Sequence, residues 1–539
     1  MSTPTLMTDP AVLGELTPQG ADAMPLPQAG GVSRRLLSGT AVLGASVMVE
    51  RGTGFLANIL AARFAGAPVF GAYALGISTA NNISTYAAGG IGATATRFSG
   101  KYTEENGSYA TFARVLAVVA LTSAAVAALA LWAGAGPIAT LLHKPELTSL
   151  LRWAALSAAG MIVLECARGF FVGQRRLQAL GTLSLLVGLG MVLLLPPVSL
   201  THHATTMVTV QGCITVGAVL LCVLLAKPLR LLAATPNGAH VAFRPMLREV
   251  WGFGLVQLMG LLSANLAGWW LTALVARGDG TLVQMGFFAI ASQLRNLTGI
   301  VPALLTESSY AVMAGEESTT SSLPDRVMAL CTYASILVSY ALAGLGMIVV
   351  PWLLHLLYGA RYKDAAVAAA VAMGVAVIQM GNSPPSARMS IVSVRWVAAG
   401  NTCWALAVAG AGSVWMWHGG SATQAMVVFF AGHVLLSVLV FAILRRHGHL
   451  PEGVVPLFLL STGGMAALAA LAAIRAAQPG HEALWTGCMF MLFLASGLAL
   501  LMLGRRRNWM VALERPLAMA RDAAQRLTGG RLSSKGAGL

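Results

Sequence analysis

Long apolar runs recur along this 539-residue chain and constrain its fold more than any other feature. Runs of about 18 or more apolar residues can cross a bilayer as helices, whereas the strands of a membrane barrel alternate in polarity and are only about ten residues long. Hydrophobic residues make up 57% of the chain and charged residues only 10%. A soluble globular domain has about a quarter of its residues charged, so that class is excluded. The sequence predicts an all-α, polytopic membrane protein.

The boundaries of these runs predict about fourteen transmembrane helices, and the short loops between them make neighbouring helices antiparallel. The expected spans are 36–64, 70–98, 110–134, 150–171, 178–200, 205–226, 248–275, 283–311, 325–350, 364–386, 394–417, 421–444, 454–474 and 483–504.

The spans divide into two six-helix lobes and a C-terminal helix pair. We expect the N-lobe over 34–226, a cytoplasmic linker over 227–247, the C-lobe over 248–444 and the helix pair over 445–504. Residues 1–33 hold five prolines and no basic residue, which favours a disordered tail. From Arg505 to Lys535 the chain carries eight basic residues, with apolar ones at roughly helical spacing. We therefore predict a basic amphipathic tail over 505–539 that lies on an anionic membrane surface, with a soluble tail as the alternative.

The distribution of Lys and Arg predicts the orientation of the helices, because cytoplasmic loops are enriched in these residues. With a cytoplasmic N-terminus, 25 of the 34 basic residues fall in the tails and in the loops on the cytoplasmic side. Two lie within spans, and the seven on the opposite side are Arg63, Lys144, Arg152, Arg277, Arg361, Lys363 and Arg475. Both termini are therefore expected in the cytoplasm. The net charge of +15 follows from this topology and does not indicate a nucleic-acid partner.

The chain shows no pattern typical of a metal site, a cofactor site or covalent catalysis. Its six cysteines form no CxxC or Cys/His cluster, so neither a disulfide framework nor a metal site is predicted. The sequence also lacks DxD, P-loop and HExxH patterns. We expect no cofactor and no enzymatic activity.

Polar residues at mid-membrane depth indicate where a functional site lies. Arg51 falls near the middle of the first span, roughly 20 Å along the helix. A charge at that depth costs at least ~2.5 kcal/mol in contact with lipid, so Arg51 is expected to face protein or water. Arg295 lies at a similar depth in the eighth span, as do Asn81 and Asn82 in the second.

Two segments that follow the first and seventh spans reveal an internal repeat. The first reads LAARFAGAPVFGAYAL and the second LVARGDGTLVQMGFFAI. The matching pairs are Arg63–Arg277 and Gly66–Gly280 at a spacing of 214, and Gly71–Gly286 and Tyr73–Phe288 at a spacing of 215. Both copies start on the same side of the membrane, so the repeat axis runs along the membrane normal. Transporters built from two lobes bind at the interface between them, near the midplane.

The repeat sets polar residues of the second and eighth spans opposite one another. At a spacing of 214, Asn81 corresponds to Arg295 and Asn82 to Asn296. We predict a central cavity whose substrate-binding residues are Arg51, Arg295, Asn81, Asn82, Asn296 and Gln293. Two alternatives stay open: the asparagines only hydrogen-bond a neighbouring helix, and the arginines only pair with acids that stabilise the bundle.

Glu50 and Glu307 are candidate ion-coupling groups. Glu50 adjoins Arg51, but adjacent helical residues point about 100° apart, so Glu50 either lines the cavity separately or contacts another helix. Glu165 and Arg168 form an i, i+3 pair that indicates a structural role. His433, in the twelfth span, is interpreted as a packing residue.

Several segments of the chain are similar to one known group of membrane proteins. They are the run from Arg51 through Gly71 and Tyr73, LLHKPEL before the fourth span, GFFVGQRRLQALG after it and LLYGARYKDAA before the tenth. Together they resemble the multidrug/oligosaccharidyl-lipid/polysaccharide exporter superfamily, and most of all its bacterial polysaccharide-biosynthesis branch, the O-antigen and exopolysaccharide repeat-unit flippases. The resemblance covers about residues 36 to 445. It implies a V-shaped bundle in the bacterial inner membrane that alternates between inward-open and outward-open states, and a substrate made of undecaprenyl diphosphate carrying a short oligosaccharide.

The chain is also similar to the lipid II flippase of peptidoglycan synthesis, through the stretch RGTGFLANILAARFAG and the expected helix count. That relative has an Arg-Asp pair in its first helix where this chain has Ala57 and Asn58. The departure favours a different lipid-linked sugar. By the same match, Arg51 falls on an arginine that is important in that relative.

Three functions are weighed on this basis. The first is a flippase for an undecaprenyl-diphosphate-linked oligosaccharide, with membrane lipids and the polysaccharide polymerase or export machinery as further partners; guanidinium groups suit phosphate oxygens. The second is a multidrug or cation antiporter, which would need membrane acids, whereas no Asp lies in the interior of any expected span. The third is a membrane polymerase or ligase, for which a long outer loop with catalytic groups would be expected.

Overall fold

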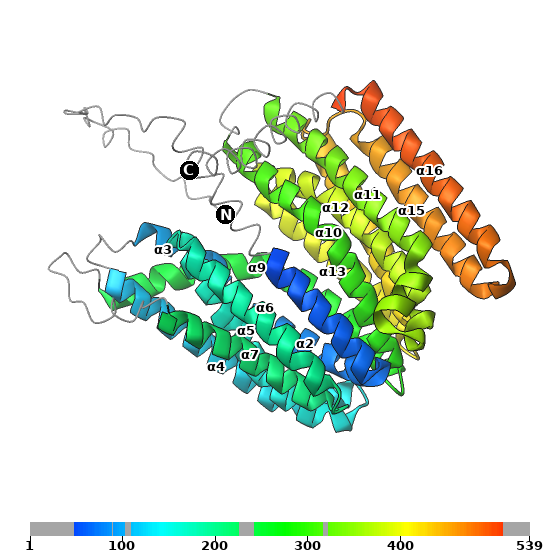
Figure 1. Cartoon of the computed structure of the whole chain (residues 1–539). Coiled ribbons are helices and arrows are strands. Elements are labelled where there is room, and N and C mark those ends of the chain that lie inside the picture. The colour runs from blue at the N-terminus through cyan, green and yellow to red at the C-terminus, as the bar shows by residue number, and fades with distance from the viewer. Residues whose placement is uncertain (1–47, 89, 103–108, 226–241, 316–321, 510–539) are drawn as a thin grey trace, which may run out of the picture.

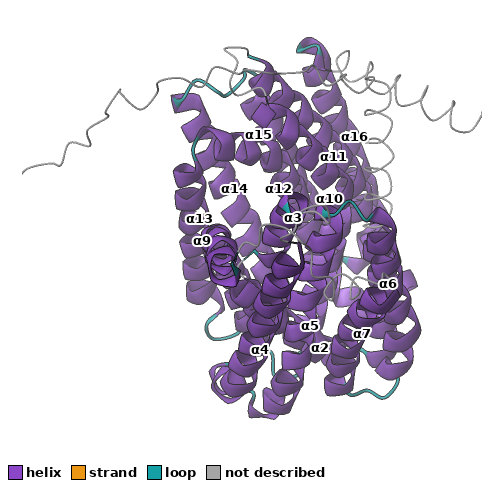
Figure 2. Ribbon diagram, turned by 90° about the vertical axis from the view of Figure 1, so that its left-hand side faces the viewer, coloured by secondary structure: helices purple, strands orange, loops and turns teal. Residues whose placement is uncertain are grey.

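The computed structural model describes residues 48–88, 90–102, 109–225, 242–315 and 322–509, and every element in these ranges is a helix or a short connection (Figure 2). The tail expected over 1–33 lies outside the described residues, as do most of the linker over 227–247 and most of the tail over 505–539.

The helices follow one another without an intervening strand in the described ranges. The N-terminal half contains a first helix over 48–65, α2 (Ala67–Ala88), α3 (Ile91–Lys101), α4 (Tyr109–Leu141), α5 (Thr148–Gly173), α6 (Leu177–Ser199) and α7 (Ala204–Leu225). The C-terminal half contains α9 (Phe243–Gly278), α10 (Val283–Gly315), α11 (Leu323–Tyr358), α12 (Ala366–Val392), α13 (Val394–Met416), α14 (Ala422–Arg446), α15 (Val454–Ala477) and α16 (Glu482–Arg506). Short 3-10 turns precede α5, α12 and α16; they are η2 (Pro145–Leu147), η3 (Ala360–Ala365) and η4 (Pro479–His481).

Eleven helices in the described part of the chain are long and apolar enough to cross a membrane. They match the third to sixth and the eighth to fourteenth expected spans. The first, second and seventh expected spans correspond to the first helix, to α2 with α3, and to α9. α2 contains Asn81, Asn82 and many small residues, which lowers its mean hydropathy. The predicted all-α, polytopic fold is confirmed.

The helices form two bundles that meet at one end and diverge toward the other, like a V (Figure 1). The first helix to α7 form the N-lobe, and α9 to α14 form the C-lobe, with α15 and α16 packed beside α11 and α12. α9 contacts helices of both lobes: α2, α3 and α4 on one side, α13 and α14 on the other. Near its start, Glu249 accepts a 2.7 Å bond from the Lys101 ammonium at the end of α3. α9 therefore bridges the interface between the lobes.

The second expected span, 70–98, is not one helix. It is divided into α2 and α3, and Gly90 between them has a left-handed backbone with φ of +73°. Only glycine adopts this conformation at little cost, so the helix ends and restarts in a new direction. The prediction of a continuous helix missed this break because two glycines in an apolar run also fit a membrane span.

Close packing of α3 against α5 depends on a GxxxG pattern in α5. A Cβ on Gly169 would lie 2.2 Å from the carbonyl oxygen of Gly92, and one on Gly173 would lie 2.4 Å from that of Thr96. Small residues four apart let two membrane helices approach until their backbones touch. This contact holds α3 on the N-lobe after the break.

The lobes meet through a pair of glycines at the narrow end of the V, which we call the closed end. A Cβ on Gly71 of α2 would lie 2.2 Å from the carbonyl oxygen of Leu282, and a Cβ on Gly286 of α10 would lie 2.4 Å from that of Ala67. The two contacts are symmetric, because both pairs of residues are related by the same spacing of 215. The repeated glycines, Gly71 and Gly286, thus form the contact that joins the lobes.

This contact also corrects the register of the repeat. The predicted correspondence of Asn81 with Arg295 used a spacing of 214. The paired glycines relate α2 to α10 by 215, which places Asn81 opposite Asn296. At this spacing Arg295 corresponds to Ala80 of α2, so the arginine has no polar equivalent in the N-lobe.

Side chains from one lobe bind backbone carbonyls of the other around the same end. The Arg63 guanidinium donates to the carbonyl of Leu356 at 2.8 Å, and the Tyr362 hydroxyl donates to that of Ala62 at 2.9 Å. The Lys144 ammonium, only 7% exposed, donates to the carbonyl of Gly280. These bonds add to the glycine contact and close this end of the interface.

Candidate functional site

A cavity of about 460 Å³ lies between the two lobes, and we call it the amide cavity. Its walls come mainly from α2, α9 and α10. Five of the six predicted site residues line it: Asn81, Asn82, Gln293, Arg295 and Asn296. Further amides on its walls are those of Asn58, Gln211 and Asn265.

A second cavity, of about 470 Å³, contains the sixth predicted residue, and we call it the arginine cavity. Arg51 lines it together with Arg295, and α12 contributes Gln379 and Met380. The two cavities adjoin, because four residues line both: Asn58, Gln293, Arg295 and Asn296. All six predicted residues therefore surround one pair of adjoining cavities.

Helical periodicity explains how each wall is built. Residues at i, i+3, i+4 and i+7 share one face of a helix. On the first helix these are Arg51, Gly54, Phe55 and Asn58, and on α9 they are Asn265, Gly268, Trp269 and Thr272. The glycine on each face leaves space beside the polar side chains.

Arg295 lies where the two cavities join and is held by an aromatic ring. Its guanidinium carbon is 5.2 Å from the centre of the Phe429 ring, within the range of a cation–π contact. Its Nε atom is buried and has no hydrogen-bond partner among the described residues. A buried donor without a partner costs on the order of 1–3 kcal/mol. Arg295 therefore retains strong capacity to bind an anion.

Arg51 is more exposed than Arg295 and faces the arginine cavity. It forms no ion pair with any acid in the described ranges. The alternative in which both arginines only neutralise acids of the bundle thus finds no support among those residues. Neither Asp nor Glu belongs to the described lining of either cavity. Two guanidinium groups with no carboxylate beside them produce a positive potential, which a low-dielectric wall strengthens.

The side-chain amides of the amide cavity provide uncharged hydrogen-bond donors and acceptors. The Oδ1 atom of Asn82 is buried without a hydrogen-bond partner in the described structure. Gln293 accepts a 3.3 Å bond from the Tyr358 hydroxyl, and the Trp269 indole donates to the Thr79 hydroxyl at 3.1 Å. The last bond joins α9 to α2 and fixes the plane of an aromatic ring on the cavity wall. Ordered amides beside a fixed aromatic face are suited to a polyhydroxylated ligand.

Glu50 contacts other helices of the N-lobe. Its carboxylate accepts bonds from the Arg168 guanidinium of α5 and, at 3.0 Å, from the Ser184 hydroxyl of α6. Arg168 also contacts Glu165 at 3.3 Å. Of the two predicted placements for Glu50, the structure has the contact with another helix. The cluster ties the first helix to α5 and α6.

Replacement of Arg168 by Gln is expected to lower thermal stability, because it leaves the Glu50 carboxylate, only 22% exposed, without its positively charged partner. The double variant Glu50→Gln/Arg168→Gln should lose less than the two single variants together, with a coupling free energy on the order of 1 kcal/mol. Thermal unfolding of the purified variants measures this, with the exposed Arg446→Gln as control. Strictly additive losses would show that the two side chains do not stabilise each other and would contradict the structural role.

The remaining sequence candidates lie apart from this cluster. Glu307 is in α10, and its side chain lies outside the described residues. The His433 ring is 5.3 Å from the Trp404 ring and 6.4 Å from the Phe429 ring, a packing position in agreement with its interpretation. His433 thus supports the ring that carries Arg295.

Sequence reasoning missed several residues that line the cavities. Asn58 and Trp269 are the most informative, because Asn58 borders both cavities and Trp269 presents an aromatic face. A signal for Asn58 was present: it lies seven residues after Arg51, on the same helical face. Trp269 carried no such signal, since tryptophan is equally common where membrane helices meet the lipid headgroups.

Known proteins similar to this chain share its family or its fold. The family model described as "Polysaccharide biosynthesis protein" matches residues 36–314. No curated protein matches the chain in sequence.

Among solved structures, an inward-facing multidrug resistance MATE family transporter of the MOP superfamily has a TM-score of 0.61 at 13% identity, covering 76% of this chain and 98% of the other. The lipid II flippase MurJ in an inward closed conformation has a TM-score of 0.59 at 10% identity, covering 87% and 99%. A MOP superfamily transporter from Pyrococcus furiosus has a TM-score of 0.53 at 14% identity, covering 76% and 95%.

The family model covers more than half of the chain, and the solved structures share its two-lobed helical fold. Those solved structures are of transporters and of a lipid II flippase. The chain belongs to the polysaccharide biosynthesis protein family, as a multi-pass membrane protein with the fold of the MOP superfamily.

Proposed function

We propose that the protein is a flippase that moves an undecaprenyl-diphosphate-linked oligosaccharide across the bacterial inner membrane by alternating access. One observation carries the proposal: Arg51 and Arg295 line adjoining cavities between the lobes, and no carboxylate belongs to the described lining. A positive cavity at this depth is suited to an anion that must leave water.

The two cavities bind different parts of such a substrate. The diphosphate binds between Arg51 and Arg295, whose planar guanidinium groups match phosphate oxygens. The sugars occupy the amide cavity, where Asn81, Asn82 and Asn296 offer hydrogen bonds and Trp269 offers a flat face. The polyprenyl chain stays in the bilayer, because its transfer into a polar cavity would be unfavourable.

The shape of the bundle supports loading from the cytoplasmic side. The first helix begins toward the wide end of the V and ends at the closed end (Figure 1). With the N-terminus in the cytoplasm, as the basic residues predict, the wide end faces the cytoplasm. The substrate enters from the cytoplasmic leaflet, and release requires the glycine contact and its neighbouring bonds to open.

The alternative functions would require other residues on the walls of the cavities. A multidrug or cation antiporter would place acids where its cation binds, whereas the described lining here carries arginines. Against lipid II as substrate stands Asn58, a neutral residue that borders both cavities at the place where the resemblance to the lipid II flippase has a charged pair. Export of a polysaccharide repeat unit, for an O-antigen or an exopolysaccharide, fits both observations.

Reconstitution tests the proposal directly. Proteoliposomes that contain the purified chain and a labelled undecaprenyl-diphosphate oligosaccharide are expected to move the label between leaflets, as measured by its exposure to an impermeant glycosidase. Vesicles without protein should retain the starting distribution. Exchange of a labelled organic cation for protons, with no movement of the lipid-linked sugar, would replace the proposal with the antiporter function.

A further inference from the structure

A third cavity lies at the turn between α4 and α5, on the closed-end side of the N-lobe, and we call it the turn cavity. Its volume is about 780 Å³, and its lining residues are Trp132, Pro145, Glu146, Thr148, Ser149, Arg152, Trp153 and Leu156. It shares no residue with the amide cavity or the arginine cavity. Its role is therefore separate from the transport site.

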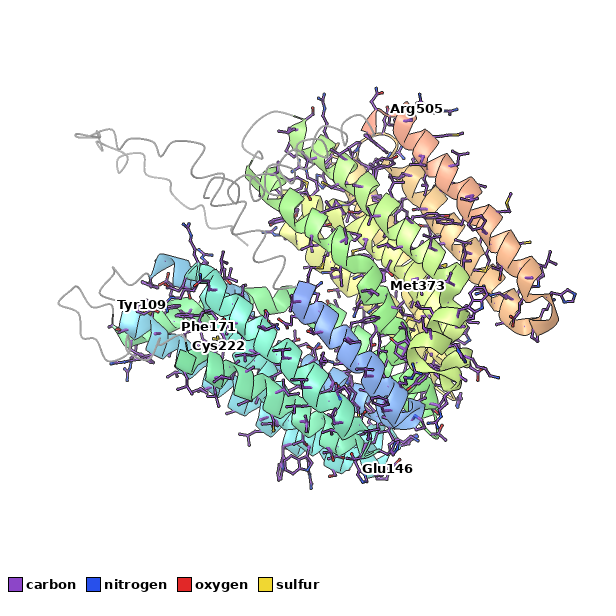
Figure 3. All side chains as sticks on the ribbon, in the orientation of Figure 1. Tyr109, Glu146, Phe171, Cys222, Met373 and Arg505 are labelled. Carbon is purple, nitrogen blue, oxygen red and sulfur yellow. The ribbon has the colours of Figure 1, made fainter. Side chains whose placement is uncertain are left out.

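The turn cavity lies at a membrane boundary. α4 and the segment from η2 through α5 are both candidate membrane spans, and Glu146, in the turn between them, is at the tip of the N-lobe (Figure 3). The 33 residues of α4 make a helix about 50 Å long, against about 30 Å of hydrocarbon. If the excess is shared between both faces, Trp132, nine residues before the end of α4, lies about 4 Å below the boundary. That is the level at which tryptophan meets lipid headgroups.

In the turn cavity, the basic group lies against an aromatic ring. The guanidinium carbon of Arg152 is 5.1 Å from the centre of the Trp132 ring. The Trp132 and Trp153 side chains remain 56% and 52% exposed. The cation–π contact holds the guanidinium beside the Trp132 ring and leaves its N–H groups able to bind a phosphate.

An acid faces the same space without neutralising the arginine. Glu146 and Arg152 both line the cavity, yet they form no ion pair with each other or with other described residues. Two opposite charges held apart in one cavity complement a ligand that itself carries two separated opposite charges. A ligand with a negative charge alone would be repelled by Glu146.

We propose that the turn cavity binds the headgroup of a zwitterionic phospholipid of the phosphatidylethanolamine type, in the leaflet at the closed end. The phosphate contacts Arg152 and the Ser149 hydroxyl, and the ammonium donates hydrogen bonds to Glu146. Trp132 and Trp153 flank the glycerol and the upper acyl chains. A choline headgroup has no N–H to donate, and a glycerol headgroup has no positive charge, so both bind more weakly.

Because of the position of the cavity, a bound lipid would affect the contact between the lobes. The same turn carries Lys144, which donates to the carbonyl of Gly280 in the C-lobe. A lipid that orders this turn therefore favours the closed end in its closed arrangement.

Native mass spectrometry of the full chain, released from nanodiscs that contain equal amounts of phosphatidylethanolamine, phosphatidylcholine and phosphatidylglycerol, tests the proposal. The wild-type protein is expected to retain phosphatidylethanolamine at least fivefold over each of the others. Glu146→Gln should reduce its preference over phosphatidylglycerol to about equal, and Arg152→Gln should reduce retention of all three. Both residues are on the surface, so the variants should fold, and a thermal transition checks this.

Arg446→Gln, an exposed arginine at the end of α14, provides the matched control and should retain lipid as the wild type does. Equal retention of the three lipids by the wild type would overturn the proposal. The same holds if Glu146→Gln leaves the preference unchanged, or if the cavity retains a soluble oligosaccharide in place of lipid.

Discussion

Arg295→Ala is expected to reduce translocation of the lipid-linked oligosaccharide about 100-fold while the protein remains folded in the membrane. Loss of one partner of a desolvated charge pair costs on the order of 3 kcal/mol, and about 1.4 kcal/mol corresponds to a factor of ten. Arg295 lies where the two cavities join and is fixed by Phe429, so its loss removes a preorganised phosphate contact. The measurement is the initial rate of leaflet exchange in proteoliposomes.

The design of the variant series separates charge from geometry. Arg295→Lys keeps the charge without the planar fork and is expected to lie between the wild type and Arg295→Ala. Arg51→Ala should have a smaller effect, because Arg51 is more exposed. Arg446→Ala is the control, with its arginine at the exposed end of α14. Full activity of both Arg295→Ala and Arg51→Ala would show that the phosphate binds elsewhere.

Gly71→Ala is expected to open the closed end. The new Cβ would lie 2.2 Å from the carbonyl oxygen of Leu282 and 2.8 Å from the amide nitrogen of Gly286, both backbone atoms that cannot rotate away. α2 and α10 must therefore separate, and the lobes with them. Gly286→Ala should act in the same way, because its Cβ would lie 2.4 Å from the carbonyl oxygen of Ala67.

Thiol labelling measures this opening. A single cysteine introduced as Ser78→Cys, on the wall of the amide cavity, reports access in a background whose native cysteines are replaced. Its labelling by an impermeant reagent from the outer side should rise about tenfold with Gly71→Ala, the result of a shift of about 1.4 kcal/mol toward the open arrangement. Gly217→Ala in α7 is the control, since a Cβ there meets nothing within 4 Å. Unchanged labelling with Gly71→Ala would show that the glycine contact does not close this end.

Much of the candidate site can be predicted, because depth along a membrane helix can be counted from the sequence. Arg51, Asn81 and Arg295 are polar residues at mid-depth by this count, and all three line the adjoining cavities. The repeat was visible because the glycines at its centre allow no side chain, and Gly71 and Gly286 prove to be the contact itself.

Counting along a helix cannot choose between partners on different helices. Glu50 adjoins Arg51 in sequence, but its carboxylate binds Arg168, which lies in another helix. The register of the repeat had the same difficulty: spacings of 214 and 215 both matched residues, and only the backbone contact at Gly71 selected 215. Trp269 was missed for this reason too, because its role depends on the bond to Thr79 across the interface.

The amino-acid sequence by itself determined that the chain is a bundle of membrane helices with two related halves and polar residues at mid-depth. Apolar runs and residue spacings can be read directly along the chain. The hydrophobic effect is enough to place such runs in the bilayer as helices. The tertiary structure alone decided which polar residues share a cavity, how the lobes meet and where Glu50 is neutralised. Those outcomes depend on the rotation of each helix about its axis and on backbone contacts between helices, which are set only when the helices pack.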